Sequence, residues 1–281
     1  MKAATGYPTR IVCLTEETTE TLYLLGEDAR IAGVSGYTVR PPEARKKPKV
    51  SAFISARFDK ILELEPDMVF AFSDLQADIA RELIRLGVTV FTFNQRTVKE
   101  ILQTILTVAR IVGVEDKGQA LVARLTVHLE AIAASASRFP HRPRVLFEEW
   151  SDPLISGIHW VEELIEIAGG EPVFPELRKH QAAKDRIVQP TDVIPADPEV
   201  IIGSWCGRKL KKDFIRSREG WSAISAVREH HIYEIKSTYI LQPGPAALTE
   251  GIRQLHAVLA QVAGCDVKPE LKPEGHVDKD L

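Results

Sequence analysis

The sequence predicts an α/β protein of two lobes, each built on a mainly parallel sheet, with one long rigid helix joining them. Three observations support this prediction. Short β-branched or aromatic runs alternate with helical periodicity along most of the 281 residues. Near the middle, two consecutive helical patterns interrupt the alternation. The segments on either side of that interruption resemble each other weakly.

The expected strands form two groups in chain order. The first group is RIVCL (10–14), IAGV (31–34), MVFAF (68–72) and VTVFTF (88–93). The second group is RVLFE (144–148), EVIIG (199–203) and HIYEI (231–235). Helical periodicity follows these runs, which is typical of parallel strands connected by helices on the faces of a sheet.

Two helices are expected between the two groups of strands. Residues 97–112 have the periodicity of one helix, Gly113 interrupts it, and a second helix runs from Glu115 to about Ser137. At about 1.5 Å per residue the second helix would be roughly 35 Å long, enough to connect two lobes. The expected organisation is an N-terminal α/β lobe (9–96), a helical connection (97–142), a C-terminal α/β lobe (143–264) and a frayed tail (265–281).

Two pairs of segments indicate an internal repeat. RIVCLTEETTETLYLLG and RVLFEEWSDPLISGIHWVEELIEIAGG share a strand, a polar break and a helix that ends at glycine. EPDMVFAFSD and DPEVIIGSWC share an acid-proline-acid entry into a strand. The spacing from Arg10 to Arg144 nearly equals the spacing from Pro66 to Pro198. Chance similarity between generic α/β segments is the alternative explanation.

Composition restricts the class of protein. Hydrophobic residues make up 44% and charged residues 27% of the chain, and the formal net charge of −3 offers no basic surface for nucleic acid. No apolar run approaches the roughly 18 residues that span a bilayer, and MKAATGYPTR lacks the apolar segment of an export signal. The cysteines Cys13, Cys206 and Cys265 have no CxxC spacing, and Cys13 is expected in the core. We expect a monomer.

Motifs of common enzyme classes are absent from the sequence, which contains no GxSxG, GxxxxGK[ST], GxGxxG or HExxH. The pairs Glu16/Glu17 and Glu148/Glu149 are neighbours in sequence, whereas acid and base groups usually come from separate elements. Cys206 and His159 could act as nucleophile and base, but nothing in the sequence fixes their geometry. We therefore expect no enzymatic activity, no catalytic cofactor and no resident metal ion.

Aromatic and polar residues gather where the expected strands end. In open parallel sheets, ligands bind beyond the carboxyl ends of the strands. If the lobes face each other, these loops line one cleft, with flat rings for a bulky ligand and polar groups to orient it. Core or edge packing is the alternative for each tryptophan and for Phe72.

The stretch FEEWSDPLISGIHWVEELIEIAGG (147–170) carries several of these residues. Its amphipathic helix is expected to begin near Val161 and to stop at Gly169, which leaves His159 and Trp160 in the preceding loop as cleft residues. A surface or hydrogen-bonded histidine is the alternative for His159. Glu148 and Glu149 should point to opposite faces of the strand, so that at most one lies in the cleft and the other is in solvent. Asp152-Pro153 predicts a turn.

Longer segments resemble a known family. RIVCLTEETTETLYLLGEDARIAGVSGYTVRPPEARKKPKVSAF and FDKILELEPDMVFAFSDLQADIARELIRLGVTVFTFN resemble the substrate-binding proteins of bacterial cobalamin and iron-siderophore ABC importers. AGGEPVF and PGPAALTEGIRQL extend the resemblance over roughly residues 10–264. It implies the fold known as a periplasmic binding protein with a helical backbone. The pattern is closest to the cobalamin-binding members, in which aromatic side chains clasp the corrin.

The resemblance also implies roles for particular residues. The positions that match the aromatic clasp are Tyr37, Phe53, Phe72, Trp150 and Tyr239. One surface acid per lobe docks such proteins on an ABC permease dimer; Asp59 matches the first acid. Near the second acid the chain has Thr191 followed by Asp192, so that carboxylate is shifted. A tryptophan expected after PVF is absent and replaced within KHQAAKDRIVQ.

We therefore expect a non-enzymatic protein that holds a corrinoid, cobalamin or a related compound, in a cleft between the lobes. The expected ligand contacts are Tyr37, Phe53, Phe72, Asn94, Arg96, Glu149, Trp150, His159, Trp160, Trp205, Tyr239 and Gln242.

Two alternatives stay open. One is a ferric siderophore or haem carrier, with Arg96, Arg208 and Lys209 contacting anionic groups. The other is a cytoplasmic protein that handles a corrinoid or a metal, with Cys206 or His159 as the metal ligand. By resemblance the protein is periplasmic or at the cell surface, whereas the lack of an export signal in this chain leaves a cytoplasmic location open.

Overall fold

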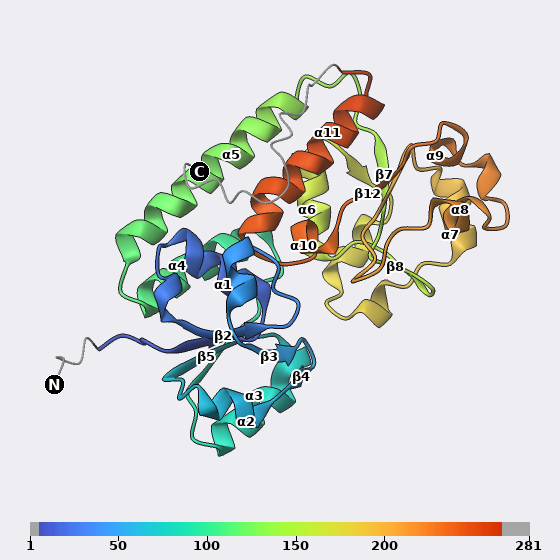
Figure 1. The fold of residues 1–281 in the computed structure, drawn as a ribbon. Helices are drawn as coiled ribbons and strands as arrows, with labels where there is room; N and C mark the ends of the chain where they lie inside the picture. The colour runs from blue at the N-terminus through green and yellow to red at the C-terminus, as the bar shows by residue number, and fades with distance from the viewer. Residues whose placement is uncertain (1–5, 266–281) are drawn as a thin grey trace. The chain divides into compact units, whose positions relative to one another are not determined.

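The computed structural model describes residues 6–265, which form two units, each with its own sheet (Figure 1). The N-terminal unit comprises residues 6–95 and Lys99–Leu125, and the C-terminal unit comprises Arg96–Val98 and residues 126–265. Helix α5 (Glu115–Ala136) runs from the first unit into the second. The predicted α/β fold with two mainly parallel sheets and a long connecting helix is confirmed. Beyond Cys265, the predicted frayed tail lies outside the described residues.

The N-terminal sheet has the strand order β4-β3-β2-β1-β5-β6, parallel except for the β3–β4 hairpin. Its strands are β1 (Ile11–Cys13), β2 (Ile31–Ser35), β3 (Lys49–Ala52), β4 (Ser55–Ala56), β5 (Met68–Phe72) and β6 (Val90–Phe93). Side chains alternate along each strand, so Val12 and Val69 pack on one face with Ile61 of α2 (Phe58–Glu63) and Leu83 of α3 (Ala77–Arg85). Helices α1 (Glu16–Leu24) and α4 (Val98–Ile111) cover the other face (Figure 1).

The C-terminal sheet has four parallel strands in the order β10-β7-β11-β12. These are β7 (Arg144–Glu148), β10 (Glu171–Pro172), β11 (Val200–Gly203) and β12 (Ile232–Glu234), and a separate hairpin consists of β8 (Trp150–Ser151) and β9 (Leu154–Ile155). Leu146 and Ile201 belong to a core cluster with Val193 of α7 (Pro190–Ala196), Ile215 of α8 (Lys212–Arg216) and the buried Trp221. Helices α6 (His159–Ile167) and α11 (Ile252–Val262) lie on the other face (Figure 1).

Shorter elements complete the two units. The helices of the C-terminal unit are α6 (His159–Ile167), α7 (Pro190–Ala196), α8 (Lys212–Arg216), α9 (Ser225–Arg228), α10 (Ser237–Ile240) and α11 (Ile252–Val262). Single turns of tighter or wider helix are η1 (Asp28–Arg30), η2 (Pro42–Lys46), η3 (Asp74–Gln76), η4 (Pro175–Lys179), η5 (Ala183–Arg186), η6 (Trp221–Ala223) and the π-helical η7 (Ala247–Gly251). No helix within residues 6–265 is both long and apolar enough to cross a membrane.

The internal repeat is confirmed by strand order and register. The order β2-β1-β5-β6 in the first sheet corresponds to β10-β7-β11-β12 in the second. Ile11 pairs with Met68 in the first sheet, and Val145 pairs with Val200 in the second. Ile11 and Val145 each follow the arginine that begins their segment, and Met68 and Val200 are each the second residue after the proline of theirs. Chance similarity between generic segments would not reproduce the register.

The acid-proline-acid segment that leads into β5 in one unit and into β11 in the other has the same geometry in both. The residue before the proline has a positive φ, 45° at Glu65 and 38° at Asp197. An arginine at the start of the neighbouring strand segment donates from Nε to the carbonyl of this residue: Arg10, just before β1, to Glu65 at 3.2 Å, and Arg144, the first residue of β7, to Asp197 at 2.9 Å. A left-handed backbone is costly for a residue with a Cβ, so the arginine hydrogen bonds help to hold it in place.

Candidate functional site

The loops that leave the carboxyl edge of the N-terminal sheet present apolar side chains, which we call the N-terminal rim: Tyr37, Phe53, Ile54, Phe72 and Leu75. Tyr37 is 59% exposed, Ile54 71% and Leu75 55%, whereas Phe72, the last residue of β5, is 4% exposed. Large apolar side chains gathered at one exposed edge are typical of an interaction site. Sequence reasoning found the three aromatic residues but missed Ile54 and Leu75.

A buried glutamine fixes two loops of the N-terminal rim. The Gln76 side chain is fully buried, its amide nitrogen donates to the Phe53 carbonyl at 2.7 Å, and its amide oxygen accepts from the Phe72 backbone N–H at 2.9 Å. Phe53 has a φ of 42°, so this bond supports an unfavourable backbone conformation. The Phe53 and Phe72 positions are therefore held before any ligand arrives.

Two carboxylic acids lie at the same edge, in the first turn of α1. Burial raises the pKa of Glu17 to about 8, against a hydrogen bond from the Thr15 hydroxyl, and burial also raises the pKa of Glu16. Oε2 of Glu17 is buried and has no hydrogen-bond partner. Glu17 therefore holds its proton to a higher pH than an exposed glutamate does.

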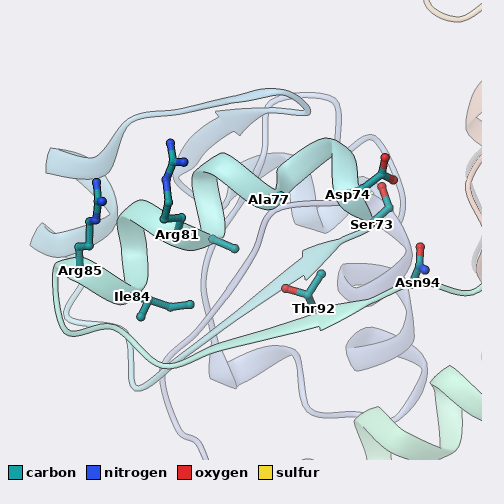
Figure 2. A pocket seen from close by; sticks show the side chains of 9 residues that line it. Ser73, Asp74, Ala77, Arg81, Ile84, Arg85, Thr92 and Asn94 are labelled. Atoms are coloured by element: carbon teal, nitrogen blue, oxygen red, sulfur yellow. The ribbon is translucent and has the colours of Figure 1, made fainter. Parts of the chain in front are cut away.

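A groove of about 570 Å³ runs along the outside of the N-terminal unit between α3 and the edge strand β6 (Figure 2). Ser73, Asp74 and Asn94 lie at one end, and Arg81 and Arg85 lie further along α3. Asn94 is exposed, and none of the N-terminal rim residues lines the groove. The predicted ligand contact of Asn94 stays a prediction.

The C-terminal unit has a corresponding edge, where Trp150, Trp205, Arg208, Tyr239 and Gln242 form what we call the C-terminal rim. Trp150 is half-buried on the β8–β9 hairpin, its indole N–H donates to the Asp152 carbonyl at 3.0 Å, and the Arg208 guanidinium lies 4.8 Å from its ring. Trp205 is 6% exposed and its N–H points to Glu148 Oε2 at 3.3 Å. Trp150 therefore offers more surface to a ligand than Trp205 does.

The prediction that one of Glu148 and Glu149 is solvated is wrong. Glu148 is fully buried and paired through both oxygens with Arg218, and Glu149 pairs at 2.7 Å with Arg186, itself 1% exposed. Burial raises the pKa of Glu148, and the Arg218 charge opposes that shift. Sequence reasoning missed both arginines because each pairs with a glutamate distant in the chain.

The same two arginines hold the hairpin that carries Trp150. Arg218 donates from Nη2 to the Ser151 carbonyl at 3.1 Å, and Arg186 donates to the Ser156 carbonyl. Arg186 comes from the segment KHQAAKDRIVQ, where the resemblance led us to expect a tryptophan. The turn predicted at Asp152-Pro153 is confirmed as the tip of this hairpin. The Trp150 position is thus fixed by buried charge pairs on both sides.

The prediction of a loop at His159 and Trp160 is also wrong, because α6 begins at His159. Ile158 is extended and its carbonyl accepts from the Glu162 backbone N–H at 3.1 Å, so the first helical turn closes two residues earlier than the apolar periodicity indicated. Trp160 is 2% exposed and its N–H donates to the Ile240 carbonyl at 2.9 Å. It joins α6 to α10, the helix that carries Tyr239.

The remaining predicted contacts are distributed as follows. Arg96, Tyr239 and Gln242 are half-buried, and the Gln242 carbonyl accepts from the Gly244 backbone N–H. His159 is half-buried, with Nε2 at 3.5 Å from Glu163. Cys206 is exposed, and no cluster of three metal-ligating side chains occurs in the described part of the chain.

The two acids expected to dock on a permease occupy equivalent places. Asp59 lies in the first turn of α2 and Asp192 in the first turn of α7, and both are exposed. Helix α2 ends two residues before Glu65, and α7 ends at the residue before Asp197, so each helix leads into the positive-φ acid of its own unit. The spacing between the two proline motifs would place the counterpart of Asp59 at Thr191, so Asp192 is one position further along, as the sequence indicated.

Comparisons with known proteins extend this description. A family model described as periplasmic binding protein matches residues 11–239. The chain is 27% identical over 261 residues to an ABC transporter substrate-binding lipoprotein of Bacillus subtilis (strain 168), covering 88% of this chain and 79% of that protein. It is 27% identical over 244 residues to a vitamin B12-binding protein of Vibrio parahaemolyticus, covering 85% of each.

Solved structures share the fold. The periplasmic vitamin B12-binding protein BtuF of Vibrio cholerae superposes with a TM-score of 0.72 at 22% identity, covering 91% of this chain and 98% of that chain. The periplasmic haem-binding protein RhuT from Roseiflexus sp. RS-1 gives a TM-score of 0.76 at 23% identity, covering 89% and 98%.

Proposed function

Because this chain belongs to the periplasmic binding protein family, the substrate-binding proteins of ABC importers, we propose that it binds a corrinoid such as cobalamin for import. The family that the sequence motifs suggested is thereby confirmed, while the ligand is our proposal. A curated relative at 27% identity is named as a vitamin B12-binding protein and is matched over 85% of its length. That relative makes a corrinoid the first ligand to test.

The observation that carries the proposal is the aromatic and apolar surface on each rim. Tyr37 is the most exposed aromatic residue of the N-terminal rim, and Trp150 is the half-buried ring of the C-terminal rim. A corrin is large and flat, with an apolar perimeter and amide substituents, so aromatic side chains suit its edges and faces. Glu149, Arg186, Glu148 and Arg218 neutralise each other in pairs, so they support the rim without adding net charge.

A role in import also requires a permease partner and a location outside the cytoplasm. We propose that Asp59 and Asp192 contact an ABC permease dimer, since each is an exposed carboxylate at the start of a corresponding helix. The relatives are named as periplasmic or as a lipoprotein, and we place this protein likewise outside the cytoplasm. A shared cleft and the ligand contacts of Phe53, Phe72, Arg96, His159, Trp205, Tyr239 and Gln242 stay predictions.

Isothermal titration calorimetry with cyanocobalamin, haem and a ferric siderophore tests the proposal. We expect cyanocobalamin to bind at micromolar concentration or below. The Trp150→Ala variant should lose about 1–2 kcal/mol of binding free energy, because it removes a half-buried aromatic contact. Tyr37→Ala should also weaken binding.

Phe91→Ala is the matched control, because Phe91 is an exposed aromatic residue on β6 that belongs to neither rim. The Phe91→Ala variant should bind cyanocobalamin with the same affinity as the parent protein. Absence of binding by any corrinoid, together with binding of haem or a siderophore, would replace the proposed ligand.

A further inference from the structure

The loop between β11 and α8 and the first residue of α8 together carry four cations that have no ion-pair partner among the described residues. Arg208, Lys209, Lys211 and Lys212 are all exposed, and no carboxylate among residues 6–265 lies within ion-pair distance of them. Nearby arginines differ, since Arg216 pairs with Asp213 and Arg218 with Glu148. The unpaired charge is therefore confined to residues 208–212, at the C-terminal rim.

This loop has a defined shape rather than only a charge. Leu210 is 6% exposed and fills the space in which a side chain on Gly203 would lie, so β11 needs a glycine there. The Leu210 backbone N–H donates to Glu234 Oε1 at 3.1 Å, and the Arg208 N–H donates to the Trp205 carbonyl at 3.0 Å. Both ends of the segment are anchored, which holds Arg208 and Lys209 at the edge of the sheet.

Arg208 is arranged to bind an anion. Its guanidinium carbon lies 4.8 Å from the centre of the Trp150 ring, within the range of a cation–π contact. None of the guanidinium N–H groups has a hydrogen-bond acceptor among the described residues, so these donors are available to an anion. The planar set of guanidinium donors matches two oxygens of a phosphate, and the next residue, the exposed Lys209, supplies a second positive charge.

We propose that Arg208 and Lys209 form a subsite for the phosphodiester of a complete corrinoid, with Trp150 supporting the guanidinium. The inference rests on the proposed function and makes it more specific. Cobalamin carries one phosphodiester, in the loop that links its nucleotide base to the corrin, whereas cobinamide has the same corrin and lacks the phosphate. The protein accordingly selects complete corrinoids over cobinamide.

Calorimetric titrations with cyanocobalamin and dicyanocobinamide at low ionic strength test the subsite. We expect the parent protein to bind cyanocobalamin about tenfold more tightly, in line with one charge-assisted contact. In the variant that combines Arg208→Gln with Lys209→Gln, the cyanocobalamin affinity should fall to that of cobinamide, while the cobinamide affinity stays unchanged. Arg208→Lys keeps the charge but loses the planar set of donors, so its preference for cyanocobalamin should lie between those of the parent and the double variant. Raising the salt concentration should reduce the preference of the parent.

The matched control removes two charges elsewhere on the same unit by combining Arg138→Gln with Arg228→Gln, both exposed and absent from the C-terminal rim. It should keep the preference for cyanocobalamin. Equal affinities of the parent for both corrinoids, or a parallel loss for both in the Arg208 and Lys209 variant, would overturn the subsite and leave the proposed function standing. If the parent binds neither corrinoid, the proposed function itself fails, and the subsite fails with it.

Discussion

Replacing Arg218 by methionine is expected to lower the free energy of unfolding by about 3–5 kcal/mol, because the fully buried Glu148 would lose its counter-charge. The same change removes the hydrogen bond to the Ser151 carbonyl and so loosens the hairpin that carries Trp150. Urea unfolding at pH 7, followed by circular dichroism, measures the effect. Corrinoid binding by the folded variant should weaken as well.

Two comparisons make this result specific to the buried pair. Arg216→Met breaks an ion pair to Asp213, whose side chain is 97% exposed, and should cost less than about 1 kcal/mol. Combining Arg218→Met with Glu148→Leu removes both charges and should recover much of the loss, since an apolar pair needs no counter-charge. If the double variant is as unstable as Arg218→Met alone, unpaired burial of Glu148 is not the cause.

The Glu162→Gln variant is expected to change how stability depends on pH. Glu162 lies in α6 and is 4% exposed, and its Oε2 has no hydrogen-bond partner. Burial raises its pKa from 4.5 to about 8, against the opposing charges of Arg178 and Arg186. The folded chain therefore keeps a proton that the unfolded chain releases between about pH 4.5 and 8, so stability falls as the pH rises through that range.

The effect of removing this titratable carboxyl group should be visible in the free energy of unfolding measured at pH 4.5, 6.5 and 8. Glu162→Gln should nearly match the parent at the lowest pH and exceed it by about 4 kcal/mol at pH 8. Glu166→Gln changes a neighbouring residue on the same helix that pairs with Arg178, and should differ from the parent by less than about 1 kcal/mol throughout. The burial argument fails if Glu162→Gln and the parent have the same pH dependence.

The main strands could be predicted because their own residue types and the turns on either side indicate a strand. Runs such as MVFAF and EVIIG are apolar, β-branched or aromatic and bounded by turns, and the structure places β5 and β11 within one residue of them. Strands β3 and β10 were not predicted. KVSA holds a single large apolar residue and EP is only two residues long, so neither has a periodicity to detect.

The sequence predicted where in the fold the candidate site lies, but not which of its side chains are exposed. The carboxyl ends of the expected strands identified Phe72 and Trp150 from the sequence, whereas Tyr37 was identified by the family resemblance. Exposure could not be predicted: Trp160 and Trp205 are buried, whereas Ile54 and Leu75 are open. The outcome depends on side chains that arrive from distant segments, and such contacts leave no trace in local patterns.

The repeat shows where the two halves have diverged. Only residues 14–15 separate β1 from α1, whereas residues 149–158 separate β7 from α6, and the longer connection contains the hairpin with Trp150. Loops of this kind accept insertions without disturbing the sheet beneath them. In a scaffold of two similar units, ligand preference can therefore be changed in one unit by a longer connection, while the other unit has a short turn at the same place.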